Sequence, residues 1–307
     1  MQKRPLVVGS VAIDILFDIH GTIQEKIVLV DGKLGGQNLM FTAGMKEERY
    51  GGTGGNIAYG LGLLGAKPIL FASAGPDFEN LFRRHLVKKG IDVRVYVDPS
   101  NWTATFYGMS DRQKEQIGIW QPNAHANLGR APLLETVSET ELKKVSVAIF
   151  SGHPALLYPH MQKVRKLLGK KVQMIFDPGK MITLEDRRVL ERGMRLADIF
   201  IVNEVELHQA HKTLNRTTEE IFDFGIKAII ETRGETGSII YQKGSPATVI
   251  PAVKAKKVVE TTGAGDAYRA GLIHGLLKGK TLRESCELGA KIAAKSVAFR
   301  GAQTYRL

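Results

Sequence analysis

Residues 260–271 read Glu-Thr-Thr-Gly-Ala-Gly-Asp-Ala-Tyr-Arg-Ala-Gly and combine small residues, one carboxylate and the start of an apolar run. Gly263, Ala264 and Gly265 leave their backbone amides open to a ligand. Because the first N–H groups of a helix lack internal partners and lie at the positive end of its dipole, this turn predicts an anion site. Asp266 would repel an anion, but it could accept a proton from a second substrate. An anion hole beside a general base is what phosphoryl transfer to an alcohol requires. The alternative is a small-residue loop that only caps a helix.

A second glycine-rich segment runs from Tyr50 to Ala58 and contains Gly52 and Asn56. Glycine permits close approach of the backbone to a ligand, and an asparagine side chain offers two donors and an acceptor. The helix expected after this segment carries Gly60 and Gly62, each of which costs about 1 kcal/mol relative to alanine. This cost indicates tight packing or a nearby ligand, and a turn with a close helix–sheet contact is the alternative.

Strand-like apolar runs alternate with helical patterns along most of the chain. We expect strands at Leu6–Ile13, Pro68–Ala74, Val147–Ser151, Val172–Phe176, Ile199–Val202, Ala228–Thr232 and Gly237–Tyr241. We expect helices at Asn56–Leu64, Phe78–Lys89, Tyr158–Leu168, Arg187–Leu196, Glu204–Leu214, Thr218–Phe224 and Ala267–Leu277. This alternation predicts a three-layer α/β/α sandwich around a mostly parallel central sheet.

Two segments interrupt the alternation, at approximately residues 17–50 and 93–120. Their short alternating stretches, such as Thr103–Met109, indicate strands that are half exposed to solvent. We therefore expect one domain over residues 1–307, with a small β-sheet lid formed by these two insertions.

The composition is typical of a soluble globular protein, with 307 residues, 43% hydrophobic and 24% charged. The single cysteine, Cys286, excludes an internal disulfide, fits a reducing compartment and is expected to pack within a helix. No apolar run approaches the roughly 20 residues of a membrane helix. The N-terminal run Leu6–Ile13 favours a buried strand over a secretion signal, because Asp14 and Asp18 place charges directly after it. We expect a cytoplasmic protein without a membrane partner.

The formal net charge of +12 could serve either nucleic acid or a small polyanion. The basic residues are scattered and their densest cluster, Lys254–Lys257, is short. We therefore expect no nucleic-acid partner. His208 and His211 lack companion ligands, so we expect no zinc site. Residues 279–281 resemble the end of a phosphate-binding P-loop but lack its earlier glycine. We expect a helix to end at Gly279 and a capping box over Thr281–Glu284 to begin the next helix.

Residues 260–266 resemble the C-terminal signature of the ribokinase-like (PfkB-type) sugar and nucleoside kinases, and residues 50–58 resemble the N-terminal one. The resemblance covers essentially the whole chain and is greatest to bacterial adenosine kinases. Further matches are Asn38–Phe41, Phe176–Gly179, Asn203–Glu206, Thr232–Glu235, Ile250–Val253, Asp266–Arg269 and Gln303–Tyr305.

This resemblance implies a ribokinase-like fold and ATP-dependent phosphorylation of the ribose 5′-hydroxyl of a nucleoside, with adenosine as the first candidate. A broad-specificity nucleoside kinase and a ribokinase-type sugar kinase are alternatives within the same class. A non-catalytic nucleoside or nucleotide sensor on the same fold is a further alternative. Asp266 argues against a sensor, because a sensor needs no base.

The resemblance also assigns roles to individual residues. Asp266 would be the general base, and the amides of Gly263, Ala264 and Gly265 would stabilise charge. Asp14, Gly52 and Asn56 would hold the ribose, with Asn38 and Phe41 of the lid near the nucleoside. ATP would be bound by Asn203, Thr232, Gly234 and Arg269, and Glu206, together with Asn203, would organise Mg²⁺ through water. A monovalent cation is less expected, because Glu260 stands where relatives have aspartate. The partners would be a nucleoside and ATP, and the protein a monomer or a homodimer.

Overall fold

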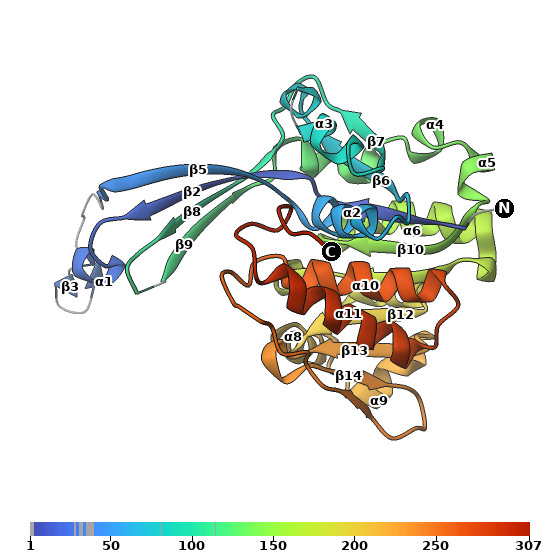
Figure 1. The fold of residues 1–307 in the computed structure, drawn as a ribbon. Coiled ribbons are helices and arrows are strands. Elements are labelled where there is room, and N and C mark those ends of the chain that lie inside the picture. Colours follow the sequence, from blue (N-terminus) through green and yellow to red (C-terminus); the bar gives the residue numbers. More distant parts are fainter. Residues whose placement is uncertain (1–2, 28, 31–32, 35–39, 81, 114) are drawn as a thin grey trace.

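The main sheet has nine strands in the order β15-β14-β13-β12-β11-β10-β1-β6-β7 (Figure 1). The structure is a computed structural model and describes residues 3–27, 29–30, 33–34, 40–80, 82–113 and 115–307. Seven of the strands are parallel: β1 (Arg4–Gly9), β6 (Ile69–Ala74), β7 (Asp92–Val97), β10 (Val145–Ser151), β11 (Gln173–Asp177), β12 (Ile199–Asn203) and β13 (Ala228–Thr232). The antiparallel strands are β14 (Ser238–Tyr241) and β15 (Thr248–Ile250). The predicted mostly parallel sheet is confirmed.

Helices cover both faces of this sheet, because its strands are apolar on both sides. In β1, for example, Leu6 and Val8 enter one core and Val7 enters the other. One core includes α6 (Pro154–Leu168), α7 (Arg187–Leu196) and α8 (Glu204–Leu214). The opposite core includes α2 (Thr53–Leu63), α3 (Phe82–Val87), α10 (Ala264–Leu277) and α11 (Leu282–Ser296). The three-layer arrangement is therefore confirmed.

Shorter elements complete the described structure. They are α1 (Ile23–Lys26), α4 (Leu133–Thr136), α5 (Glu139–Leu142), α9 (Thr218–Ile221), β3 (Leu29–Val30) and β4 (Lys33–Leu34). Single 3₁₀ segments lie at Pro76–Glu79, Asn123–Arg130, Gly169–Lys171, Gly179–Leu184, Phe222–Phe224 and Gly234–Thr236. Two local predictions hold: Cys286 is fully buried in α11, and Thr281 forms a capping box with Glu284 at the start of that helix.

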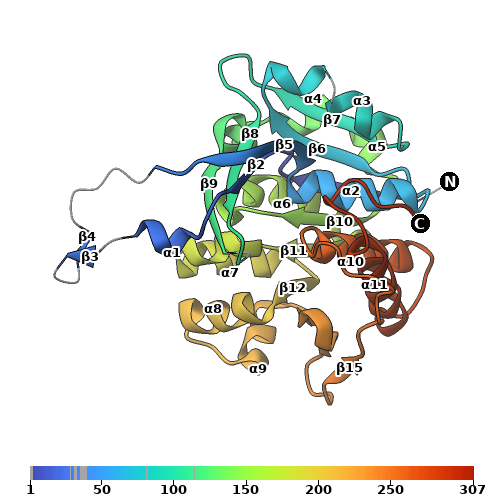
Figure 2. The same cartoon turned by 60° about the vertical axis from the view of Figure 1, so that its left-hand side comes forward.

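A second, four-stranded sheet projects from the body and forms the lid (Figures 1 and 2). Its order is β5-β2-β8-β9, from β5 (Ala43–Gly51), β2 (Ala12–Ile19), β8 (Ala104–Ser110) and β9 (Gln116–Gln121). Strands β2 and β8 are parallel, and the other two pairs are antiparallel. The small sheet expected from the two interrupting segments is present.

The boundary between the two sheets differs from the sequence expectation. Leu6–Ile13 is not one strand, because the chain leaves the main sheet after Gly9 and enters the lid at Ala12. Ser10 fixes this crossing: its carbonyl accepts the Gly55 amide at 3.0 Å and its hydroxyl accepts the Thr53 amide at 3.0 Å. Asp14 consequently lies in β2 of the lid.

Several other boundaries also differ. Residues 93–97, expected in the lid, belong to β7 at the edge of the main sheet. The single helix expected at Phe78–Lys89 divides into a 3₁₀ turn and the shorter α3. The helix expected from Asn56 begins three residues earlier, at Thr53, because Gly52 adopts the N-cap position with a φ of 85°.

In the part of the chain that the structure describes, no helix has the length and apolar character needed to cross a membrane.

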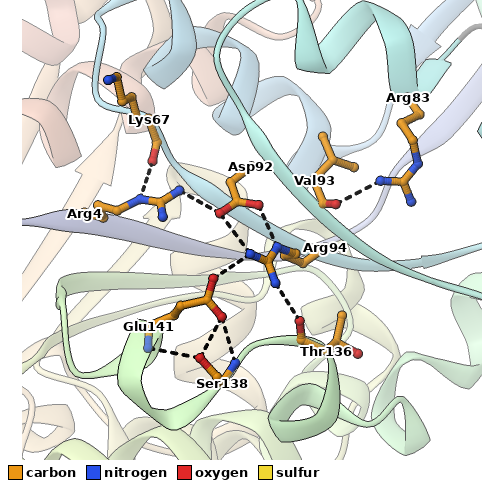
Figure 3. A network of polar contacts seen from close by, with 9 residues as sticks. All are labelled: Arg4, Lys67, Arg83, Asp92, Val93, Arg94, Thr136, Ser138 and Glu141. Atoms are coloured by element: carbon orange, nitrogen blue, oxygen red, sulfur yellow. Dashed lines mark hydrogen bonds and ion pairs between the residues drawn. The ribbon is translucent and has the colours of Figure 1, made fainter.

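A polar network fastens the β7 edge of the main sheet (Figure 3). The Arg94 guanidinium donates to Asp92 at 2.6 Å, to the Thr136 carbonyl at 3.0 Å and to Glu141 at 2.5 Å. Arg4 of β1 also donates to Asp92, at 2.9 Å. Arg94 thus joins the sheet edge to the segment that contains α4 and α5.

Arg94→Ala should lower the free energy of unfolding by about 1–2 kcal/mol, because two carboxylates and one carbonyl lose a shared donor at a partly buried edge. The measurement is urea unfolding at pH 7. Arg187→Ala is the matched control, because it removes an exposed pair with Glu191 within one helix and should cost under about 0.5 kcal/mol. Equal effects of the two substitutions would contradict this role for Arg94.

Candidate active site

The first turn of α10 forms the candidate anion site. Gly263 caps the helix with a φ of 80°, and a Cβ there would collide with Ala302, so glycine is required on both counts. The first bond of the helix runs from the Ala267 amide to the Gly263 carbonyl at 2.9 Å. The amides of Gly265 and Asp266 precede that bond and lie at the positive end of the helix dipole. The Ala264 amide differs from them, because it donates to the Thr261 carbonyl at 3.1 Å.

Asp266 is oriented by a chain of side-chain amides. Its Oδ2 accepts a hydrogen bond from Asn56 Nδ2 at 2.8 Å. Asn56 Oδ1 in turn accepts from Gln303 Nε2 at 3.0 Å, which sets the Asn56 amide so that its nitrogen faces Asp266. Gln303 also contacts the Gly51 carbonyl at 3.4 Å. The carboxylate therefore lies at a fixed position beside the Gly265 turn.

Burial raises the pKa of Asp266 to about 7, while the positive charge of Arg269 and the hydrogen bond from Asn56 oppose that rise. The neighbouring carboxylates Asp177 and Glu206 raise it further. A carboxylate whose pKa lies near neutral pH can both take a proton and release it. The role of general base that the sequence suggests for Asp266 is compatible with this pKa.

Asp14 brings a second carboxylate to the site from the lid. It lies against Gly51, where a Cβ would collide with its carboxylate, and opposite Arg49 in the β2–β5 pairing. Burial raises the pKa of Asp14 to about 7; Arg49 lowers it, and the charges of Asp266 and Glu260 raise it. The lid carboxyl is therefore close enough to Asp266 for the charge of Asp266 to raise its pKa. The neighbouring Gly52 has no room for a side chain, since a Cβ would lie 2.6 Å from the Ser10 carbonyl.

Arg269 is part of a buried ion pair behind the anion turn. Its Nε and Nη2 donate to the two oxygens of Asp177, both at 2.6 Å, and its Nη1 donates to the Gly265 carbonyl at 3.1 Å. Asp177 also accepts from the Ser151 hydroxyl at 2.6 Å. Arg269 is 7% exposed and Asp177 2%, so losing either partner would leave an uncompensated buried charge. Arg269 thus supports the Gly265 turn from behind, and its expected contact with the nucleotide stays a prediction.

The start of α8 holds the residues expected to organise Mg²⁺. Asn203 Oδ1 accepts the Glu206 amide and Glu206 Oε2 accepts the Asn203 amide, both at 2.8 Å, which is a reciprocal helix cap. Glu206 is buried, and burial together with the charge of Asp177 raises its pKa. Its Oε1 lies outside this cap. A single carboxylate with solvent water is a donor set that suits Mg²⁺, which keeps several waters and takes its other ligands from a triphosphate. The residues therefore fit Mg²⁺ held through water.

The other residues expected at the nucleotide lie along the same sheet edge. Thr232 is paired in register with Asn203 at the carboxyl ends of β13 and β12, and Gly234 comes two residues later with a φ of 54°. Ligands of parallel sheets bind at this edge. Phe41 is not brought to the cluster, because it precedes Ala43 at the end of β5 remote from Gly51. Asn38 lies outside the described residues.

Sequence reasoning gave no role to three residues that the structure places at the site: Gln303, Ser151 and Arg49. Gln303 belongs to a segment that matched the kinase family, so a signal for it was present. Ser151 ends a predicted strand and could have been noticed at the sheet edge. Arg49 gave no signal, because a charged residue in an exposed strand is ordinary.

Comparison with known proteins identifies the family of this chain. The model of the pfkB family of carbohydrate kinases matches residues 20–306, and the chain belongs to this family. It is 27% identical over 307 residues to a nucleoside kinase of Methanocaldococcus jannaschii, covering 99% of this chain and 93% of that protein. The crystal structure of the M. jannaschii nucleoside kinase superposes with a TM-score of 0.84 at 26% identity, covering 99% and 94% of the two chains.

A second solved relative is a nucleoside kinase of Burkholderia thailandensis in complex with inosine. It has a TM-score of 0.79 and 28% identity, and covers 98% of this chain and 93% of its own. These findings establish a ribokinase-like kinase of the class that phosphorylates a sugar or a nucleoside with ATP. They support nucleoside kinases in general and do not single out adenosine kinase.

The raised pKa of Asp266 predicts a pH-dependent cost to stability. A carboxyl whose pKa is higher in the folded state stabilises the fold when protonated, and that contribution is lost as the pH rises from about 4 through about 7. Asp266→Asn mimics the protonated form, so the variant should gain thermal stability relative to wild type at pH 8 and much less at pH 5.

Thermal unfolding of both proteins at the two pH values measures this effect. Asp223→Asn, which removes an exposed pair with Lys243, is the control and should show no such pH trend. A constant difference between Asp266→Asn and wild type at both pH values would mean that the carboxyl is not destabilised by burial.

Proposed function

We propose that this protein is an ATP-dependent nucleoside kinase that phosphorylates the ribose 5′-hydroxyl of several purine nucleosides, adenosine among them. One observation carries the proposal. Asp266 and the Gly265 amide belong to the same first turn of α10, and Asn56 of α2 holds the Asp266 carboxylate in place by a hydrogen bond. A base and an anion-binding turn in such proximity suit an alcohol attacking a phosphate.

In this reaction the 5′-hydroxyl oxygen attacks the γ-phosphorus, the bond from that phosphorus to the bridging oxygen of ADP breaks, and the hydroxyl proton moves to Asp266. The amides of Gly265 and Asp266 stabilise charge on the transferred group. The Ala264 amide would join them only if it exchanged its bond to Thr261. Mg²⁺, when bound with ATP, neutralises triphosphate charge, and Glu206 would hold it through water.

Asp14 is the residue that we propose for the acceptor. A carboxylate with two acceptor oxygens suits a vicinal diol such as that of ribose. Gly52 leaves room for close approach, and Asn56 keeps one amide hydrogen beyond its bond to Asp266.

Support for a nucleoside rather than a free sugar comes from the nucleoside kinases of M. jannaschii and B. thailandensis. The inosine complex of the second favours acceptance of more than one purine base. A strict adenosine kinase is the second candidate, favoured by the sequence parallels at Phe176–Gly179 and Gln303–Tyr305.

The first test measures ADP formation with adenosine, inosine, guanosine, cytidine and ribose in turn. We expect turnover with adenosine and at least one other purine nucleoside, and little with ribose. Turnover with adenosine alone would support the second candidate, turnover with ribose alone would indicate a sugar kinase, and none with any acceptor would favour a sensor.

The same assay tests the base. Asp266→Asn should reduce kcat by about 10²–10⁴-fold while nucleoside binding is largely kept, because the amide preserves shape but cannot accept the proton. Asp223→Asn serves again as the control. Near-wild-type turnover in Asp266→Asn would remove this residue from the reaction.

The ion pair of Glu260 leads to a further expectation about monovalent cations. Arg49 Nη1 donates to both Glu260 oxygens, at 3.0 and 2.7 Å, so this carboxylate already has a cationic partner within the protein. We propose that activity needs no K⁺. Turnover measured with K⁺ titrated from zero, against choline at matched ionic strength, should stay within about twofold, because the charge that such an ion would neutralise is already paired. Large, saturable activation by K⁺ would contradict this proposal.

A further inference from the structure

Arg49 lies where the lid meets the anion turn. Its Nη1 binds Glu260, which precedes that turn, and its Nε and Nη2 donate to the two oxygens of Glu47, each at 2.7 Å. Only 9% of the Arg49 side chain is exposed. One planar guanidinium therefore spans two carboxylates that come from different parts of the fold. Such two-sided pairing needs the fixed fork of arginine and is not available to lysine.

Both ends of this bridge are anchored. On the loop side, the Glu260 amide donates to the Val297 carbonyl at 3.2 Å. On the lid side, Arg300 reaches Glu47 at 3.1 Å. A Cβ on Gly301 would lie 3.3 Å from the Arg49 Cδ, so the stem of the arginine is packed as well. Movement of the lid strand at Arg49 must therefore either break the pair with Glu260 or displace the loop.

The lid end of the bridge also adjoins the acceptor site. Arg49 is the cross-strand partner of Asp14, and the charges of Arg49 and Glu260 both act on the Asp14 carboxyl. Glu260 is three residues from Gly263, which packs closely against Ala302 at the start of α10. A short, stiff path thus runs from Asp14 through Arg49 and Glu260 to the turn that begins α10.

We infer that Arg49 is a positioning residue that couples acceptor binding at the lid to the geometry of the anion turn, so that the two substrates strengthen each other's binding. This inference rests on the proposed function, because it takes Asp14 as the acceptor ligand and the first turn of α10 as the phosphate site. Arg49 itself contacts neither reacting atom. Its effect lies in the coupling free energy between the two sites. In proteins such a coupling usually changes the affinity of one site for its ligand by a factor of about 5–150 when the other site is occupied.

Isothermal titration calorimetry measures this coupling. The affinity for the acceptor that wild type phosphorylates fastest is compared with and without a non-hydrolysable ATP analogue and Mg²⁺. We expect the analogue to tighten acceptor binding at least about fivefold in wild type. In Arg49→Gln and in Glu260→Gln that factor should fall to about one, while each substrate alone binds within about threefold of wild type. The kcat of both variants should fall at least about tenfold, with a smaller change in KM.

Two further variants test whether a change in the coupling factor comes from the lost bridge or from the loss of a positive charge on this strand. Lys46→Gln breaks an exposed ion pair with Glu48 on the same strand and should keep the wild-type coupling factor. Arg49→Lys keeps the charge but cannot bridge both carboxylates, so it should resemble Arg49→Gln. Thermal unfolding of each variant shows whether a loss of coupling merely accompanies a loss of stability.

The outcomes distinguish the inference from the function beneath it. An active wild type whose coupling persists in Arg49→Gln, or that shows no coupling at all, overturns the inference and leaves the kinase activity intact. A variant that is only less stable, with an unchanged coupling factor, overturns it in the same way. A wild type that phosphorylates no acceptor overturns the proposed function, and the inference with it.

Discussion

The close approach of α2 to its neighbours is the constraint on which the site depends. A Cβ on Gly54 would lie 2.8 Å from the carbonyl carbon of Gly9 in β1, and a Cβ on Gly60 would lie 2.6 Å from that of Ala270 in α10. Any side chain at these two positions would force α2 away from the sheet or from α10. The 2.8 Å bond from Asn56 to Asp266 would then be lost. Glycines within a helix cost about 1 kcal/mol each, and here that cost is offset by the contact that they permit.

The edge of the sheet gathers more negative charge than it neutralises. Strands β10 and β11 end at Ser151 and Asp177, and Arg269 is the cation that pairs with that aspartate. Asp266 and Glu206 lie near this pair, and burial raises the pKa of both. The fold therefore carries an unfavourable electrostatic term at its functional edge. A substrate with bound Mg²⁺ would relieve this term, since it brings positive charge to the carboxylates.

The layers of the fold were predictable, because the spacing of apolar residues along the sequence shows which faces of strands and helices are buried. The sheet, the helices on both faces and the lid were all expected from local sequence, and so were Asp266 and its turn. The crossing from β1 to β2 could not be predicted, because a continuous apolar run does not show where the chain leaves one sheet and enters another. Arg49 was missed for a related reason: its partner Glu260 is 211 residues away, and pairing over that distance leaves no trace in a single sequence. The ion pair of Arg269 with Asp177 was not visible either, since its partners are 92 residues apart.

The proximity of Asp14 to Asp266 has a consequence for turnover under the proposed reaction. Before transfer, both carboxyls face a neutral hydroxyl-bearing acceptor, and burial raises the pKa of each to about 7. After transfer, the acceptor carries a phosphate of about two negative charges, as phosphate esters do near neutral pH. Once Asp266 releases the proton that it took from the hydroxyl, that dianion shares the site with two negatively charged carboxylates. Repulsion would weaken the hold of the site on its own product, so the same two aspartates that receive the acceptor would also favour its departure as a nucleotide.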